Sequence, residues 1–291
     1  MANTIERKWP PLGDVIEVDG AAVHYLRMGS GPVMILIHGA SGNLRDWSFD
    51  LMPRLAMHFD VIAFDRPGHG HSARIPQGWE PARQAAQLHA AAQHLGVERA
   101  LVVGHSFGGA VSLSWALDAP EMVRGLGLLC APSHTWPGTA RALYDLFLTP
   151  GIGPVASWVY GRLARALPER QEKAVRCIFS PNPMPEGYPT YLGVPLSLRT
   201  ATVRANAEDN ARLKPFLIAQ TTQYSALPMP VLQIHGTADT IVPLSLHSEQ
   251  LKRALPQSRL IRLEGVGHMP HHARPDDVTA ALIDLAKDAA A

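Results

Sequence analysis

The sequence predicts an α/β fold: a mostly parallel, doubly wound, eight-stranded sheet with helices on both faces and an inserted helical cap. Three observations support this prediction. Short apolar runs alternate with longer amphipathic stretches, a hairpin signal opens the chain, and the alternation stops after Cys130 and later resumes. Continuous apolar runs of this length are typical of buried parallel strands that helices cover on both sides.

The hairpin signal is Asp19-Gly20, which separates strands expected at 15–18 and 23–26, because Asp-Gly favours a tight turn. Apolar runs mark the other expected strands at 33–37, 61–64, 101–103, 126–129, 231–234 and 260–263. Amphipathic stretches mark helices expected at 46–57, 80–95, 107–119, 244–254 and 276–287. Strands that alternate with helices in this way favour a doubly wound sheet.

The alternation is interrupted by a segment rich in proline and aromatic residues. This segment, 133–223, contains no convincing strand pattern. Helices are expected in it at 139–148, 154–167, 169–179 and 196–209. We therefore expect one α/β core, made of residues 1–132 and 224–291, with a helical insertion that packs over one end of the sheet.

Composition narrows the functional class. The chain has 291 residues, 46% of them hydrophobic and 18% charged, and a net charge of +1. No block of lysine and arginine supplies phosphate contacts, so we expect no nucleic-acid partner. Cys130 and Cys177 lack redox or zinc spacing, and residues 1–11 resemble neither a signal peptide nor a membrane span. These features predict a cytoplasmic protein, or a membrane-associated one if an anchor precedes Met1; the oligomeric state stays open.

A serine nucleophile is expected at Ser106. The pattern Gly104-His105-Ser106-Phe107-Gly108 directly follows an expected strand and opens an expected helix, which is the context that a G-x-S-x-G motif requires. The turn is so sharp that side chains at the glycine positions would collide with the strand or the helix. It places the hydroxyl at a helix N-terminus, where developing negative charge is favoured.

The serine needs a base, and the base needs an acid to orient it. Asp239 follows the strand at 231–234, and His268 follows the next strand in a glycine-bounded loop. Both positions fit the chain order Ser, Asp, His. For the oxyanion we expect the main-chain N–H groups of Phe107 and Ala40, with Ser41 as the fallback for Ala40.

These segments together resemble the α/β-hydrolase family over nearly the whole chain. The similarity is carried by His38-Gly39 through Trp47, by Asp65 through Ser72, by the triad motifs, and by Gly267 through Pro275. The resemblance implies the fold, the triad and a cap over the active site. It says little about the substrate, because the family spans many chemistries.

Within this family Ser106 disfavours haloalkane dehalogenases and most epoxide hydrolases, which carry aspartate at that position. Carbon–carbon bond hydrolases differ in the oxyanion loop, although Arg199 or Arg204 could bind an acidic substrate as an arginine does in those enzymes. Perhydrolases share the triad and stay an alternative. We expect a serine esterase, of carboxylesterase type, that cleaves small to medium hydrophobic esters through an acyl-enzyme. The rival class is a non-catalytic accessory or ligand-binding protein, similar to the accessory protein of magnesium chelatase.

The substrate pocket is expected to be apolar. Its candidate lining residues are Ser41, Trp136, Phe147, Trp158 and Met269. His69-Gly70-His71 and His271-His272 invite a metal interpretation, but they show no recognisable ligand spacing. No glycine-rich segment fits a nucleotide loop. We expect neither a metal nor another cofactor.

Overall fold

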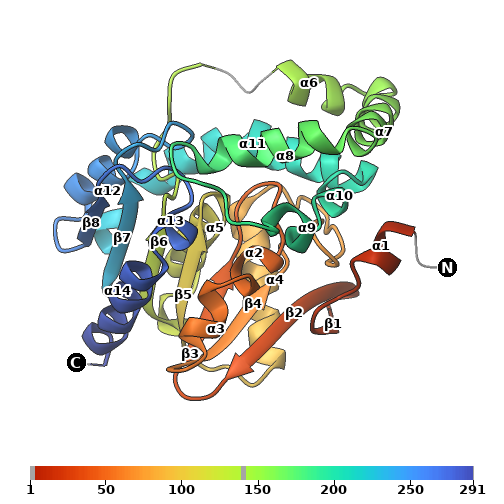
Figure 1. Ribbon diagram of the computed structural model, residues 1–291. Coiled ribbons are helices and arrows are strands. Elements are labelled where there is room, and N and C mark those ends of the chain that lie inside the picture. The colour runs from red at the N-terminus through yellow and green to blue at the C-terminus, as the bar shows by residue number, and fades with distance from the viewer. Residues whose placement is uncertain (1–3, 139–141, 291) are drawn as a thin grey trace.

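Eight strands form one sheet in the part of the chain that the computed structural model describes, residues 4–138 and 142–290 (Figure 1). The strands are β1 Asp14–Val18, β2 Ala21–Gly29, β3 Val33–Ile37, β4 Asp60–Phe64, β5 Ala100–His105, β6 Val123–Leu129, β7 Val231–Gly236 and β8 Arg259–Leu263. Their order is β1-β2-β4-β3-β5-β6-β7-β8. β2 is antiparallel to β1 and to β4, and the remaining neighbours are parallel. The predicted fold class is confirmed.

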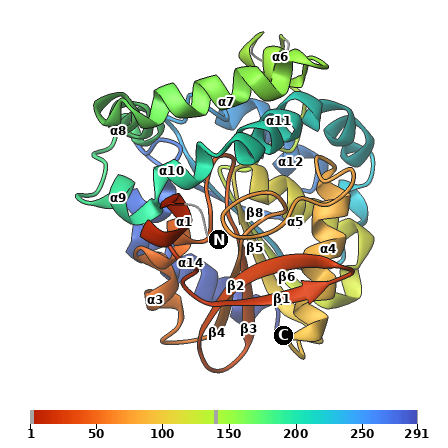
Figure 2. The ribbon, with the colours of Figure 1, turned by 90° about the vertical axis from the view of Figure 1, so that its right-hand side faces the viewer.

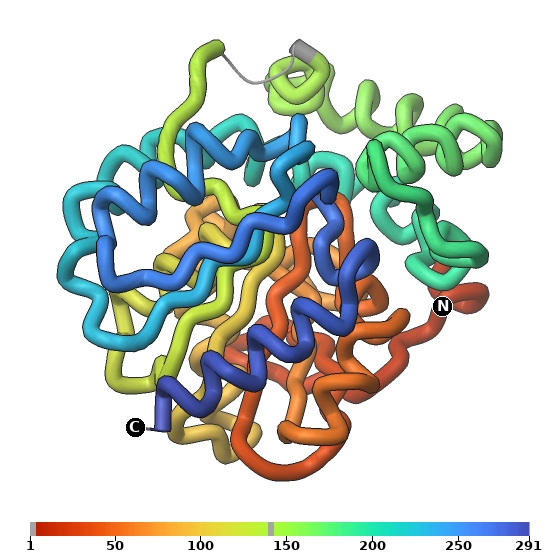
Figure 3. The backbone as a smooth tube through the Cα atoms, turned by 60° about the vertical axis from the view of Figure 1, so that its left-hand side comes forward, coloured from red at the N-terminus to blue at the C-terminus, as the bar shows by residue number. Residues whose placement is uncertain are grey.

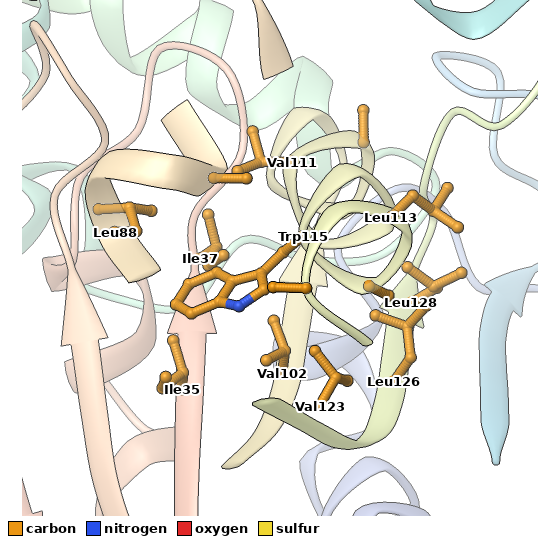
Figure 4. Close-up of a cluster of buried hydrophobic side chains, with 14 of the residues drawn as sticks. Ile35, Ile37, Leu88, Val102, Val111, Leu113, Trp115, Val123, Leu126 and Leu128 are labelled. Atoms are coloured by element: carbon orange, nitrogen blue, oxygen red, sulfur yellow. The ribbon is translucent and has the colours of Figure 1, made fainter. Parts of the chain in front are cut away.

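Helices cover both faces of the sheet (Figure 3). One face carries α4 Pro81–His94, α5 Phe107–Asp118 and α12 Ser248–Ala254, and the other carries α3 Leu51–Leu55 and α14 Pro275–Asp288. On the first face the fully buried Trp115 of α5 lies against Ile35, Ile37 and Val102 of the sheet (Figure 4). Each large apolar side chain buried in this way contributes roughly 1.5–3 kcal/mol, so this core holds the strand ends firmly in place.

The helix predicted at 46–57 is two helices, α2 Arg45–Ser48 and α3. Pro53 explains the break: it has no N–H to donate, and its ring would clash with the carbonyl of Phe49 in a continuous helix. The helix predicted at 244–254 likewise begins as a 3₁₀ turn, Leu244–Leu246, before α12. Two further short helices, α1 Thr4–Lys8 and α13 Pro270–Ala273, were not predicted.

Between β6 and β7 the described chain is helical. The helices are α6 Ala142–Leu148, α7 Ile152–Arg165, α8 Pro168–Phe179, α9 Tyr188–Leu192, α10 Val194–Ser197 and α11 Thr200–Thr221. They lie above one end of the sheet (Figures 1 and 2). Residues 139–141 of the helix predicted at 139–148 lie outside the described residues. The helix predicted at 196–209 begins later and continues to Thr221, and α9 and α10 were not predicted.

Candidate active site

Ser106 lies on the turn between β5 and α5. Its φ of 50° and ψ of −125° are values that residues other than glycine rarely adopt. A Cβ on Gly104 would lie 2.3 Å from the carbonyl oxygen of Gly108, and one on Gly108 would lie 2.1 Å from that of Ile37. The strained turn therefore needs glycine at both positions, and it leaves Ser106 8% exposed at the end of the strand.

The structure brings His268 and Asp239 together. His268 Nδ1 lies 2.7 Å from Asp239 Oδ2, and Asp239 Oδ1 accepts the main-chain N–H groups of Ile241 and Val242 at 2.8 and 2.9 Å. Burial acts to raise the pKa of Asp239, but hydrogen bonds from His235 and His268 outweigh it and hold this pKa well below its ordinary value. A carboxylate fixed in this way orients the imidazole and stabilises it when it is protonated.

The loop after β3 approaches the serine closely. A Cβ on Gly39 would lie 3.1 Å from the Cβ of Ser106, so glycine permits this approach. The N–H of Ser41 donates to Asn206 Oδ1 of α11 at 2.8 Å. Ser41 is therefore engaged with the insertion, which leaves Ala40 as the better of the two candidate oxyanion donors.

The same loop is held in place by Arg66, a fully buried residue that the sequence analysis did not identify as functional. Its guanidinium donates to the carbonyl oxygens of His38 and Gly39 at 3.0 and 3.2 Å, and it lies 4.5 Å from the ring centroid of Phe107. It also forms an ion pair of 2.8 Å with Asp209 of α11, which is equally buried. Arg66 thus ties both candidate oxyanion segments to the insertion.

Asp46 is a second buried carboxylate at the site. Its Oδ1 accepts the hydroxyl of Tyr188 at 2.6 Å and lies 2.8 Å from His272 Nε2, while its Oδ2 lies 3.2 Å from His271 Nε2. Burial acts to raise the pKa of Asp46, but the two histidines outweigh it and hold this pKa well below its ordinary value. The network joins α2, α13 and α9. The sequence did not predict this network, because the position of Asp46 is typical of the first turn of a surface helix.

Among the residues that the structure describes, two groups of side chains have the geometry to hold a metal ion. In each group the candidate ligand atoms lie within 4.8 Å of one another; the groups are Asp46, His271 and His272, and Cys130, His235 and Asp239. In both, the carboxylate is already occupied by hydrogen bonds from neighbouring side chains or main-chain amides. The sequence analysis considered His271 and His272, with His69 and His71, as possible metal ligands. In the structure His271 and His272 both contact the carboxylate of Asp46. Burial lowers the pKa of His271 to about 4.

A cavity of about 1030 Å³ opens over the serine, between the core and the insertion. Ser106, Phe107, Ala40 and His268 line it, and so do four of the residues predicted for the pocket: Ser41, Trp136, Phe147 and Met269. Asp239 lies behind His268 rather than in the lining. Trp158 does not line the cavity, and the prediction for it is wrong. It lies on α7 with 52% of its surface exposed, because smaller residues of that helix form the packing face.

With this fold and site, the chain belongs to the alpha/beta hydrolase fold family, whose sequence model matches residues 32–275. It is 30% identical over 286 residues to an uncharacterised protein of Mycobacterium tuberculosis, covering 95% of this chain and 80% of that one. It is 32% identical over 270 residues to the magnesium-chelatase 30 kDa subunit of Rhodobacter capsulatus, covering 87% and 86%.

Solved structures with the same fold include a thermophilic esterase from Thermogutta terrifontis, with a TM-score of 0.73, 24% identity and coverage of 95% of this chain and 99% of that one. The enol-lactonase from Burkholderia xenovorans matches with a TM-score of 0.75, 18% identity and coverage of 94% and 100%. Membership of this family supports a hydrolase. In the described part of the chain, no helix has the length and apolar character needed to cross a membrane.

Proposed function

We propose that this chain is a carboxylic ester hydrolase that works through an acyl-enzyme intermediate. The observation that carries the proposal is the placement of Ser106 on a strained strand–helix turn, in the same cavity as His268, whose Nδ1 lies 2.7 Å from Asp239. In this proposal Ser106 is the nucleophile, His268 the base, and Asp239 the acid that orients it.

The reaction follows from these roles. Ser106 Oγ attacks the ester carbonyl while His268 Nε2 takes its proton, and the negative oxygen accepts the N–H groups of Phe107 and Ala40. His268 then gives the proton to the leaving alcohol as the carbon–oxygen bond breaks. A water molecule, activated by the same histidine, attacks the acyl-enzyme and releases the acid, which regenerates Ser106.

The cavity favours uncharged, fairly hydrophobic esters. Its volume of about 1030 Å³ lies at the upper end for small-molecule sites. Among the described residues that line it, Asp46 and Arg170 are the charged ones, apart from histidines. Arg199 and Arg204, the candidates for an acidic substrate of a carbon–carbon bond hydrolase, are not in the lining. We further propose that residues 133–223 act as the cap that shapes this pocket, and that the protein is cytoplasmic.

One observation favours a second candidate. The similarity to a magnesium-chelatase subunit covers most of both chains, so a non-catalytic accessory role on the same scaffold is the alternative. A binding protein would not need the strained serine, both glycines and the ordered His–Asp pair. Their joint presence therefore favours the hydrolase.

Hydrolysis of p-nitrophenyl esters from acetyl to palmitoyl, with Ser106→Ala as the control, tests the proposal. We expect turnover with a chain-length optimum set by the cavity, and a loss of at least about 10³-fold in the variant. Absence of turnover on every ester, with a folded protein, would favour the accessory role. Activity retained in Ser106→Ala would contradict the assigned nucleophile.

A further inference from the structure

Helix α7 packs on the rest of the insertion through its smallest residues. Gly153, Ser157 and Gly161, spaced four residues apart, are its buried positions. A Cβ on Gly153 would lie 2.2 Å from the carbonyl oxygen of Phe147, and one on Gly161 would lie 2.3 Å from that of Leu198. The small residues therefore let α7 lie very close to its neighbours, and its large side chains must point elsewhere.

Five large apolar side chains of α7 are exposed. The exposed fractions are 57% for Ile152, 62% for Val155, 52% for Trp158, 40% for Val159 and 60% for Leu163. We call these five residues the apolar face of α7. An amphipathic helix of a globular protein normally buries its large apolar side chains, and a contiguous exposed patch of this kind marks an interaction surface.

The apolar face of α7 lies at the outer edge of the molecule and continues into the cavity. α7 lies beyond α11 as seen from the sheet (Figure 2). Leu163 of the face, together with Tyr160 and Leu167 beside it, also lines the cavity over Ser106. An apolar path therefore leads from the exposed face to the candidate site.

Basic residues outnumber acidic ones on α7 and on the next helix, α8. Residues 152–179 hold five arginine or lysine residues against two glutamates, although the whole chain has a net charge of only +1. The guanidinium of Arg162 lies 5.7 Å from the ring centroid of Trp158, so a positive charge lies next to the tryptophan of the face. The face of α7 thus combines tryptophan, leucine and valine with an adjacent arginine, and further basic residues follow on α8. Helices that lie in a membrane interface have apolar and basic residues in such a combination.

We propose that the apolar face of α7 docks on an anionic phospholipid surface, with α7 lying in the plane of the interface. A second copy of the chain is a poorer occupant, because a two-fold contact would bring the same basic residues together from both sides. An anionic bilayer complements both the apolar side chains and the surrounding charge. Docked in this way, the protein would receive hydrophobic molecules from the lipid through the path that Leu163 and Leu167 line.

Flotation with lipid vesicles tests the proposal. The probes are vesicles of phosphatidylcholine alone and vesicles of phosphatidylcholine mixed with phosphatidylglycerol. The test variant is Val155→Asp with Val159→Asp, two exposed positions outside the cavity lining. Met57→Asp is the matched control, because Met57 is 74% exposed and precedes β4 at the opposite end of the sheet.

We expect the wild-type protein to float with the mixed vesicles, more weakly with the neutral ones, and less at high salt. The double variant should bind at least about tenfold more weakly, while Met57→Asp binds as the wild type does. The urea unfolding midpoint should be unchanged in both variants, since the substituted side chains face solvent. A blue shift of fluorescence on vesicle addition, lost in Trp158→Phe, would support the same geometry.

Two results would overturn the proposal. One is wild-type protein that does not float with either vesicle, or that floats as well after the double substitution. The other is a wild-type dimer in light scattering that the double substitution converts to a monomer without any change in vesicle binding, which would make the face a self-association surface. Neither result bears on ester hydrolysis, so the two proposals stand or fall separately.

Discussion

Replacing Arg66 with methionine separates the buried ion pair from the apolar packing around it. Methionine keeps an unbranched apolar stem beside the Phe107 ring and removes the guanidinium. The loss includes the 2.8 Å ion pair with Asp209 and the hydrogen bonds to the carbonyl oxygens of His38 and Gly39. Both charged side chains are fully buried, so water cannot take over the lost interactions.

The size of the effect follows from this burial. Removing one partner of a buried ion pair costs about 3–5 kcal/mol, because the other charge is left without its partner. Asp209 keeps an ion pair of 2.9 Å with Arg74, so we expect the lower end, about 3 kcal/mol of unfolding free energy. The released loop after β3, which carries the proposed oxyanion donor Ala40, should also move, and a displacement near 1 Å costs about 10²-fold in kcat.

Urea unfolding followed by circular dichroism measures the stability, and kcat on a soluble short-chain ester measures the activity. Arg83→Met is the matched control, since Arg83 is exposed and its hydrogen bond to Gln77 lies at the surface; its effect should stay within about 0.5 kcal/mol. Adding Asp209→Leu to Arg66→Met should restore part of the stability but not the activity. An Arg66→Met protein with wild-type stability and kcat would refute this reasoning.

Three further predictions concern the pH dependence of stability, the turn at Ser106 and the loop after β3. Burial lowers the pKa of His38 and of His271 to about 4. Their contribution to stability is therefore complete above pH 6.5 and is lost as the pH falls toward 4, and for each histidine the free energy of unfolding should fall by about 1.4 kcal/mol per pH unit in this range. Urea unfolding at pH 7, 6 and 5 measures this decrease, and an unfolding free energy that does not change with pH would contradict it. Gly108→Ala places a Cβ 2.1 Å from a main-chain carbonyl oxygen, so kcat should fall by at least about 10²-fold, and wild-type kinetics would count against the strained turn. Asn206→Ala removes the acceptor for the N–H of Ser41, so kcat should fall about tenfold with little change in KM. Asn206→Asp keeps an acceptor oxygen and should retain most of the activity. An equal loss of activity in both variants would refute this role of Asn206.

Local sequence patterns were enough to predict the sheet and the candidate triad. Each triad candidate follows a short apolar run, and the carboxyl ends of parallel strands meet at one edge of a sheet. Ser106, Asp239 and His268 could therefore be placed near one another without any knowledge of long-range contacts. The glycines around Ser106 added the steric signal, because the strained turn excludes a Cβ at both positions.

The contacts between the core and the insertion could not be predicted in the same way. Arg66 and Asp209 are 143 residues apart in the sequence, and Asp46 and Tyr188 are 142 residues apart. Nothing in either local pattern identifies its partner. The wrong placement of Trp158 has a different cause. Its apolar ring made it a candidate for the pocket, but the buried side of α7 is formed by the small residues Gly153, Ser157 and Gly161.

The break in the helix predicted at 46–57 shows how local chemistry overrides amphipathic pattern. Its apolar residues do face the core, since Trp47, Leu51 and Leu55 are fully buried. Pro53 nevertheless divides the segment, and the chain turns between α2 and α3. This turn keeps Asp46 at the site while α3 lies along the sheet.

The central claim is that Ser106 is an activated nucleophile, and covalent labelling tests it most directly. A stoichiometric serine-directed phosphonate would be added to the wild type, Ser106→Ala and Asp239→Asn, and the adduct followed by intact mass and mapped by peptide analysis. We predict one adduct per chain on Ser106 in the wild type, none in Ser106→Ala, and labelling slowed by about 10³-fold or more in Asp239→Asn. A folded wild-type protein that takes up no label, or takes it up on another residue, would contradict the account.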